Sequence, residues 1–373
     1  MALPRILILY EYATLNGGEH SLLAIVDHVR REGFELVAAG PSHGPFARRL
    51  AEQAVALISF EIHSVSGIRR SQDELRGQLR EVLTGSAPDL LHANSLSMSR
   101  LSGPVVQQMC VPSIGHVRDI VKLSAAAIAD VNCHTRIIAV SQATRSWHVA
   151  HGMSEEKTHV VYNGVDLNKF QPRPATGYLH DELGLPRSPH LVGAIGQIGM
   201  RKGLDILFKA AERVVEGRDV HFIIVGQRHS QKREASEYEA ELRRLAGDTP
   251  LAGRVHFLGT RDDIDRMLNE LTLLVHAARQ EPLGRVLLEG AAAGVPIIAT
   301  DVGGTREIFS DGKSARIIPS ESVDELAKAM GDLLDSVELQ RELSMTARQC
   351  AIDTFAAPSA AAALVEHYRE CLT

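Results

Sequence analysis

The sequence predicts an α/β protein of two domains, each built around a parallel sheet that is covered by helices. Three observations support this prediction. The chain has 373 residues, and a domain with a single hydrophobic core is usually shorter than this. Short apolar runs alternate with longer amphipathic segments along almost its whole length. A stretch rich in proline and glycine, between residues 163 and 189, interrupts this alternation and marks a boundary.

The first half of the chain shows the alternation clearly. RILILY, at 5–10, has the pattern of a buried strand, and 19–31 has the pattern of an amphipathic helix. The further strands are predicted at 34–38, 55–59, 89–92, 113–117 and 135–140, with a helix at 46–53. Strands and helices at this spacing are typical of a doubly wound parallel sheet. Ser141 follows the last of these strands and is placed to cap the helix that carries Trp147.

The boundary stretch contains Pro172, Pro174, Pro186 and Pro189, and its only helix signal is a short one at 180–183. We therefore predict a first domain at 1–165, a linker at 166–188 and a second domain at 189–356. In the second domain, strands are predicted at 191–195, 221–225, 255–258, 271–276 and 296–299, with helices at 204–215, 234–246 and from Gly284. A final helix is predicted at 357–371.

Composition narrows the class of protein. Hydrophobic residues make up 45% of the chain and charged residues 23%, as in soluble globular proteins. A net charge of −6 and an aromatic content of 4% argue against nucleic acid as a partner. The cysteines form no C-x-x-C pair and are interpreted as free thiols of a reducing compartment. No targeting segment and no apolar run of about 18 residues is visible, so the expected location is cytoplasmic.

Asn16-Gly17-Gly18-Glu19 is the first of three motifs with candidate chemistry. It stands between the first strand and its helix, where glycines let backbone amides approach a phosphate and the helix N-terminus adds partial positive charge. The pattern is not the G-x-G-x-x-G dinucleotide fingerprint. Taken alone, it is more simply explained as a tight strand-to-helix turn.

Arg201-Lys202-Gly203 is the second motif, and it follows the strand at 191–195. Two cations at the carboxyl end of a strand, beside the start of a helix, suit a diphosphate group. The usual alternative for such a pair is two solvated side chains on a loop.

The third motif is Glu281-Pro282-Leu283-Gly284, followed by Glu289. Glu281 is expected in the loop before a helix, and Glu289 about two turns inside that helix. Their separation exceeds that of a glycosidase carboxylate pair, so they are not interpreted as an acid/base couple. They suit two acceptors for hydroxyl groups on one extended ligand. Glu289 lies in the apolar run 286–293, where an unpaired carboxylate would be costly.

Together with other segments, these motifs resemble those of a known family, and the resemblance spans nearly the whole chain. The second half contains GQIGMRKG, HFIIVG, RVHFLGTRDDI and EPLGRVLLEGAAAGVPIIATDVGG, and the first half contains NGGEHSLL, IIAVSQATRSW and VVYNGVDLNKF. In these segments the chain resembles the retaining glycosyltransferases of family 4. The resemblance implies the GT-B architecture, with two Rossmann-like domains facing a cleft and a C-terminal helix that crosses back to the first domain. It implies transfer of a hexose-type sugar from a UDP- or GDP-linked donor.

The resemblance also implies roles for residues of this sequence. Gly17 and Gly18 would offer amides to the donor phosphates, while Lys202, with Arg201, would neutralise the leaving diphosphate. Glu281 would hold hydroxyls of the transferred sugar.

The remaining implied contacts surround the rest of the donor. Glu289 would accept the ribose hydroxyls. Amides at the helix start would face the sugar and phosphate, and backbone at the end of an earlier strand would hold the base. The amides would be those of Gly284, Arg285 and Val286. The backbone that holds the base would be that of 258–261, which includes Gly259 and Arg261.

Two positions depart from the family pattern. Gln197 stands where the family commonly has an arginine, and Arg201 or Arg285 is a candidate to compensate. In the run 116–119, Arg118 occupies the position of a histidine that usually faces the donor sugar, and His116 shares that face of the strand. For His116, a satisfied histidine at a strand end is an equal alternative to a catalytic role.

No metal or other cofactor is expected. His148 and His151 have helical spacing but no third ligand, and no D-x-D pair follows a strand end. Two other functions stay open: a nucleotide-sugar epimerase of the same architecture, and a non-catalytic nucleotide-sugar-binding protein, which Gln197 and Arg118 make more credible. A dehydrogenase is disfavoured because neither half carries the dinucleotide fingerprint.

The acceptor is not identified by the sequence and is a glycan, a lipid or a small molecule bound by the first domain. Four basic residues, Arg69, Arg70, Arg76 and Arg80, are candidates to face an anionic membrane surface at the inner face, or a lipid acceptor. A solvated helix face is the favoured alternative for these four arginines.

Overall fold

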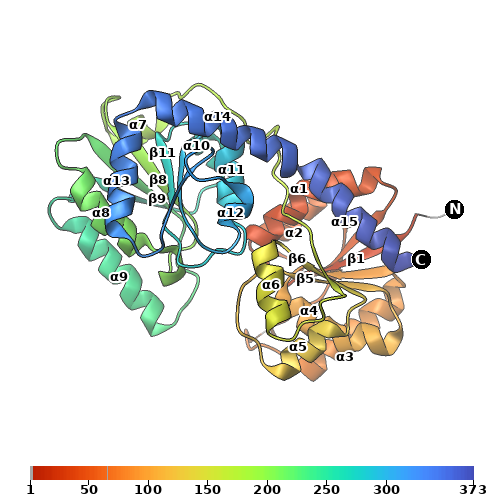
Figure 1. The fold of residues 1–373 in the computed structure, drawn as a ribbon. Helices are drawn as coiled ribbons and strands as arrows, with labels where there is room; N and C mark the ends of the chain where they lie inside the picture. The colour runs from red at the N-terminus through yellow and green to blue at the C-terminus, as the bar shows by residue number, and fades with distance from the viewer. Residues whose placement is uncertain (1–2, 65) are drawn as a thin grey trace. The chain divides into compact units, whose positions relative to one another are not determined.

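The computed structural model describes residues 3–64 and 66–373 and divides the chain into two compact units. The first unit holds the residues up to Gly164 and then Phe355–Thr373, and the second is Val165–Thr354. Each unit contains one sheet whose strands all pair in parallel (Figure 1). The predicted fold class, α/β with two parallel sheets, is therefore confirmed.

The sheet of the first unit has seven strands in the order β3-β2-β1-β4-β5-β6-β7. They are β1 (Arg5–Leu9), β2 (Glu35–Gly40), β3 (Ala56–Ser59), β4 (Leu90–Ala93), β5 (Ser113–Val117), β6 (Arg136–Ala139) and β7 (Thr158–Val160). The helices are α1 (Gly17–Arg31), α2 (Gly44–Glu52), α3 (Gln72–Ser86), α4 (Leu96–Met109), α5 (Ala125–Asn132), α6 (Gln142–Ala150) and α15 (Ala357–Leu372). The strand order reverses between β1 and β4, which places a crevice for a ligand at their carboxyl ends.

The sheet of the second unit has six strands in the order β10-β9-β8-β11-β12-β13. They are β8 (His190–Ile195), β9 (Val220–Val225), β10 (Val255–Gly259), β11 (Leu273–His276), β12 (Ile297–Thr300) and β13 (Arg316–Ile318). The helical segments are α7 (Tyr178–Leu183), the 3₁₀ turn η1 (Met200–Lys202), α8 (Leu204–Val214), α9 (Arg233–Gly247), α10 (Ile264–Leu268), α11 (Arg285–Ala293), α12 (Thr305–Ile308), α13 (Val323–Leu334) and α14 (Val337–Thr354). Here the order reverses between β8 and β11.

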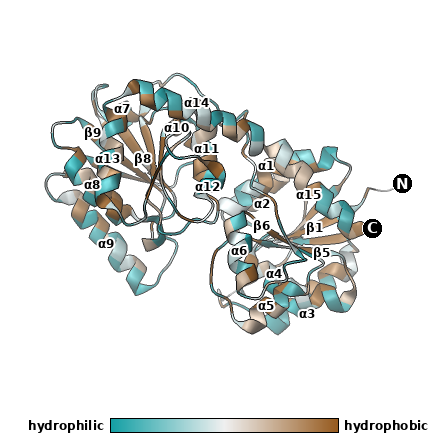
Figure 2. Cartoon of the chain, in the orientation of Figure 1, coloured by the Kyte–Doolittle hydropathy of each residue, from teal (hydrophilic) through white to brown (hydrophobic). Residues whose placement is uncertain are grey.

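The hydrophobic pattern explains why these elements pack as they do. The strands of both sheets are strongly hydrophobic, whereas the helices carry hydrophilic stretches as well (Figure 2). Strands covered by helices on both faces have no solvent side, so they show apolar runs rather than alternation. Helix α8 buries Leu204, Leu207 and Phe208 against its sheet. None of the helices over residues 3–64 and 66–373 is both long and apolar enough to cross a lipid bilayer.

Helix α15 completes the core of the first unit, although it follows the whole of the second unit in sequence. Its residues Ala361, Leu364 and Tyr368 are buried in one cluster with Ile8 of β1 and Leu22 of α1. The predicted return of the last helix to the first domain is therefore confirmed.

The segment predicted as a linker, 166–188, is part of the second unit and contains α7. Glu270 explains the difference, because this buried carboxylate anchors the segment. It accepts hydrogen bonds from the amides of Thr176 and Gly177, each at 2.7 Å. Only the signal at 180–183 indicated this order from the sequence.

Candidate functional site

The two loops that flank the reversal point of the second sheet carry a cluster of charged groups from the predicted site. The loop after β8 ends in η1 with Arg201 and Lys202, and the loop after β11 leads through Glu281 to α11. Since β8 and β11 are paired in parallel, both loops leave the sheet at the same edge. The structure thus brings together two motifs that lie 79 residues apart in the sequence.

Glu281 is a buried carboxylate held between two partners. The ammonium of Lys202 forms an ion pair with its Oε2, and Nε2 of His276, at the end of β11, lies 2.9 Å from the same oxygen. Burial raises the pKa of Glu281, but the Lys202 charge and the hydrogen bond from His276 outweigh burial and hold the pKa well below its usual range. Burial and the Lys202 charge lower the pKa of His276, which is therefore neutral and donates from Nε2. Glu281 is ionised at neutral pH.

Glycines permit the close approach of backbone that shapes this cluster. Gly203 has a φ of +63°, and a Cβ there would lie 2.0 Å from the Ala277 carbonyl oxygen. Gly303 has a φ of +52°, and a Cβ there would lie 1.7 Å from the carbonyl oxygen of Glu281. The amide of Gly304 donates to that same oxygen at 3.1 Å. A side chain at Gly203 or Gly303 would displace the loop that carries Lys202 or Glu281.

Glu289 lies in α11 with its carboxylate buried and paired. Its partner is the guanidinium of Arg285, one turn earlier in the same helix. This pairing removes the cost of a lone carboxylate in an apolar helix. It also directs Arg285 toward Glu289, so Arg201 is left as the candidate to compensate for Gln197. Gly284 precedes the helix with a φ of +98°, and the first amides of a helix, here at Arg285 and Val286, have no acceptor within it.

The other predicted donor-binding residues lie at the same edge of the second sheet. Gln197 lines a pocket together with Gly196, Lys202 and His276. Gly259 ends β10, and its carbonyl oxygen accepts a hydrogen bond from Gly226 at 2.7 Å. The Arg261 side chain binds both carboxylate oxygens of Asp263 at 2.8 Å and also contacts Glu182. The Arg261 guanidinium is therefore engaged by carboxylates of its own unit.

Near the reversal point of the first sheet, Arg118 lies beside the glycine loop and binds residues that follow β4 and β7. Its Nε donates to the Asn94 carbonyl oxygen at 2.9 Å, and its Nη1 donates to Asn163 at 2.8 Å. A Cβ on Gly18 would lie 3.1 Å from Cδ of Arg118, whereas Gly17 has open space beside it. Burial lowers the pKa of Arg118 to about 10, so the group stays charged at neutral pH. Arg118 thus provides a fixed cation beside the start of α1.

A chain of hydrogen bonds runs from Arg118 into the core of the first unit. Arg118 Nη2 lies 3.2 Å from Nδ1 of His116, which must accept because arginine only donates. His92 Nε2, at 3.1 Å, therefore also donates to this nitrogen. Burial lowers the pKa of His92 to about 3, so its ring is neutral and its Nδ1 accepts from the Tyr368 hydroxyl at 2.7 Å. The sequence-based prediction that His116 and Arg118 share a face agrees with this contact.

Several residues of these clusters were not predicted from the sequence. His276 had a detectable signal, because it is a polar residue at the carboxyl end of an apolar strand, five residues before Glu281. Asn94 has a similar signal directly after β4. Tyr368 had none, since its partner His92 is 276 residues away in the sequence.

Three of the four predicted arginines and both predicted histidines contact groups of the first unit. Arg69, Arg76 and Arg80 contact Glu11, Asp130 and Gln108, respectively. The carbonyl oxygen of Asp119 lies 2.8 Å from Nε2 of His148, and that of Trp147 lies 2.7 Å from Nδ1 of His151. Ser141 caps α6 by accepting from the Thr144 amide, as predicted. The cysteines, Cys110, Cys133, Cys350 and Cys371, are free.

Two family models match the chain, one in each half. The model for glycosyltransferase family 4 matches residues 15–169, and the model for glycosyl transferases group 1 matches residues 178–350. The first match covers the glycine loop and Arg118, and the second covers Lys202, Glu281 and Glu289. The regions matched by the family models therefore contain both clusters of the candidate site.

Similar proteins agree with these matches. Spore coat protein SA of Bacillus subtilis is 32% identical over 54% of this chain and 56% of its own length. Phosphatidyl-myo-inositol mannosyltransferase of Mycolicibacterium smegmatis is 31% identical over 54% of this chain and 49% of its own length. The chain thus spans about half the length of these curated relatives.

A solved structure shows the same fold over the whole chain. The crystal structure of Anabaena HepE in complex with UDP and glucose has a TM-score of 0.87 and 23% identity, and covers 98% of this chain and 100% of that one. With GT-B architecture and a family match in each half, this chain belongs to the family 4, or group 1, glycosyltransferases.

Proposed function

We propose that this chain transfers a hexose-type sugar from a UDP- or GDP-linked donor to an acceptor hydroxyl, with retention of configuration. The observation that carries the proposal is the cluster of Lys202, Glu281 and His276 at the reversal point of the second sheet. Family membership supports a nucleotide-sugar donor, and so do the crystal structures of HepE, which hold UDP and glucose or UDP-glucose. Retention follows from the family resemblance.

The charge state of Glu281 decides what it does in this reaction. An ionised carboxylate only accepts hydrogen bonds, so Glu281 suits the hydroxyls of the transferred sugar and does not protonate a leaving group. Lys202 has three N–H donors and can hold Glu281 and a phosphate oxygen together. Its position next to Glu281 therefore connects the sugar with the diphosphate.

The leaving diphosphate gains negative charge as the sugar–phosphate bond breaks. We assign its stabilisation to Lys202, to Arg201 and to the amides at the start of α11, where the helix dipole favours an anion. Glu289 would accept the ribose hydroxyls. Gly17 and Gly18 at the start of α1, with Arg118 beside them, would offer a second anion-binding edge in the first unit.

These cations make a divalent metal unnecessary in the proposal. Transfer should therefore proceed equally well with and without EDTA once the donor is known. A complete loss of activity in EDTA that magnesium or manganese restores would overturn this part of the proposal.

A thermal-shift panel of nucleoside diphosphates and nucleotide sugars tests the proposed donor class. A ligand present at 100 times its Kd adds about 2.7 kcal/mol to the free energy of unfolding. We expect one base to stabilise the protein in both its free diphosphate and its sugar-linked form. No stabilisation by any member of the panel would refute the proposed donor class.

Product analysis then separates transfer from the other two functions. Chromatography of the selected donor incubated alone should show no epimer, because the proposed reaction moves the sugar to an acceptor. Epimer formed without acceptor would identify an epimerase. Binding without hydrolysis or transfer, across glycan, lipid and small-molecule acceptors, would identify a non-catalytic binding protein.

A further inference from the structure

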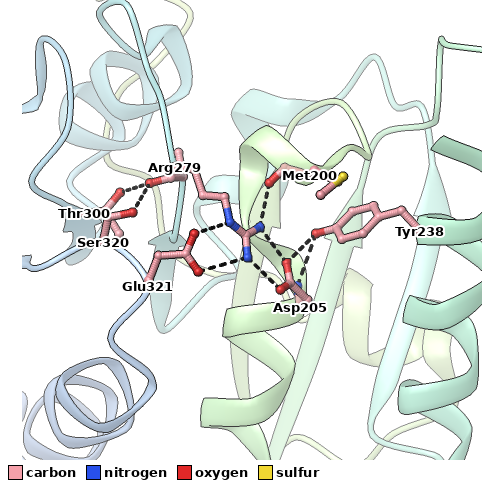
Figure 3. Close-up of polar contacts among 8 residues, drawn as sticks. Met200, Asp205, Tyr238, Arg279, Thr300, Ser320 and Glu321 are labelled. Carbon is pink, nitrogen blue, oxygen red and sulfur yellow. Dashed lines mark hydrogen bonds and ion pairs between the residues drawn. The ribbon is translucent and has the colours of Figure 1, made fainter. Parts of the chain in front are cut away.

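Arg279, which the proposed function does not use, lies at the centre of a polar cluster in the second unit (Figure 3). Its side chain donates to Asp205 Oδ1 and Oδ2, each at 2.8 Å, and binds the carboxylate of Glu321 through Nε and Nη2. Its Nη1 also donates to the Met200 carbonyl oxygen at 2.7 Å. These contacts engage all five N–H donors of the guanidinium group.

Two of the groups that Arg279 binds are main-chain atoms of the loop that carries the proposed diphosphate cations. The guanidinium donates to the carbonyl of Met200, and the Arg279 amide donates to the carbonyl of Arg201 at 2.8 Å. Arg279 therefore holds η1 at both residues that precede Lys202. Since Arg279 is two residues before Glu281, the contact also fixes the spacing between the two proposed catalytic loops.

Arg279 itself is held from other elements of the same unit. Asp205 lies in the first turn of α8, and the Tyr238 hydroxyl of α9 donates to it at 2.7 Å. Glu321 adopts a φ of +66°, an uncommon backbone conformation for a residue with a side chain. Thr300 and Ser320 donate to the carbonyl oxygen of Ala278, the residue before Arg279. The loop after β11 is thus anchored on two sides (Figure 3).

We propose that Arg279 is a positioning residue that orients Lys202 toward the donor diphosphate by fixing the main chain of Met200 and Arg201. The proposal rests on the proposed function, in which Lys202 contacts the diphosphate. Lysine cannot replace this arginine, because an ammonium has three donors and no planar fork to span two carboxylates and a carbonyl. A group held in place before the ligand binds gives more affinity than one that must be ordered on binding.

Calorimetric titration with two ligands tests the proposal. One ligand is UDP or GDP, whichever gives the larger thermal shift, and the other is the matching nucleoside. Arg279→Lys should weaken the diphosphate about tenfold, near the lower limit for losing one charge-assisted contact. The nucleoside has no phosphate, so its affinity should stay within about twofold. The matched control is Arg218→Lys. Arg218 follows the C-terminal end of α8 and, like Arg279, binds both carboxylate oxygens of an aspartate, here Asp335. This control variant should change neither affinity.

A double-variant cycle shows whether Arg279 acts through Lys202. In a Lys202→Ala background, Arg279→Lys should change diphosphate affinity by less than about twofold, because coupled residues are not additive. Equal losses for diphosphate and nucleoside, or additive losses in the double variant, would show a general structural role and overturn the proposal. If Arg279→Lys does not fold by circular dichroism, Glu321→Ala replaces it, with an expected loss of about threefold for the diphosphate alone.

The same cycle separates this inference from the proposed function. If Lys202→Ala leaves diphosphate affinity unchanged, the proposed role of Lys202 is wrong. If Lys202→Ala weakens the diphosphate while both Arg279→Lys and Glu321→Ala bind it like the unmodified protein, only the positioning role is wrong.

Discussion

The carboxyl edges of the two sheets have the same topology but different electrostatics. In each sheet the strand order reverses once, between β1 and β4 or between β8 and β11. At the edge of the second sheet, buried carboxylates pair with cations, as in Lys202–Glu281 and Arg285–Glu289. At the edge of the first, one arginine is bound by neutral groups that continue into the core.

This difference separates what the fold determines from what side chains determine. Strand order places a crevice at the same point of each sheet, and a few residues decide which ligand suits it. The second edge offers several cations and ionised acceptors, which fit a diphosphate and hydroxyl groups. The first offers Arg118, which neutral groups hold, and buried Glu11, which already pairs with Arg69. We therefore expect donor binding to depend mainly on the second edge.

The largest expected effect concerns the two glutamates of the second edge. Glu281→Ala should abolish transfer yet keep most of the affinity for the free nucleoside diphosphate, because that ligand has no sugar to hold. Glu289→Ala should weaken the same diphosphate by about 1–3 kcal/mol, since a ribose hydroxyl loses its acceptor.

Calorimetry of both variants, with circular dichroism as the control for folding, makes this comparison. If Glu281→Ala loses as much diphosphate affinity as Glu289→Ala, the division of roles between sugar and ribose is wrong.

The second prediction is that a fall in pH destabilises the first unit more than the second. Burial lowers the pKa of His92 to about 3 and that of His134 to about 4, and lowers the pKa of His116 as well. Because these values lie below that of an unfolded histidine, about 6.5, the unfolded state binds more protons as pH falls. Stability is then fully present above about pH 6.5 and decreases below it. At pH 5, His92 and His134 should each cost about 2 kcal/mol.

Hydrogen exchange read by mass spectrometry at pH 7 and pH 5, corrected for the intrinsic exchange rate, resolves this loss along the chain. The first unit, which contains all three of these histidines, should lose protection before the second, in which His276 is the fully buried counterpart. Earlier loss in the second unit would contradict the assignment.

The smallest effect concerns Tyr368 in α15. Tyr368→Phe leaves Nδ1 of buried His92 without its donor and should lower the free energy of unfolding by about 1–3 kcal/mol. Affinity for the nucleoside diphosphate should stay within about twofold if donor binding depends on the second edge. Urea unfolding and calorimetry measure the two quantities, and a tenfold loss of affinity would show that the two edges are not independent.

The sequence predicted the elements better than the contacts among their side chains. Strand 113–117 was predicted with the bounds of β5, which Pro112 precedes and the charged pair Arg118-Asp119 follows. The pairing of Arg285 with Glu289 follows helical i, i+4 spacing, yet Arg285 was considered for a phosphate. The ion pair of Lys202 with Glu281 had no local signal. It depends on which strands are neighbours, and that information is tertiary.

The return of α15 to the first unit has a consequence for how the chain is made. Residues such as Leu364 and Tyr368, which close the core of the first unit, are synthesised only after Val165–Thr354. At about 5–20 residues per second, that segment takes roughly 10–40 s to translate. During this interval the nascent first unit exposes the apolar surface of α1 and its sheet that α15 later covers. A transient binding site for chaperones is therefore built into the order of translation.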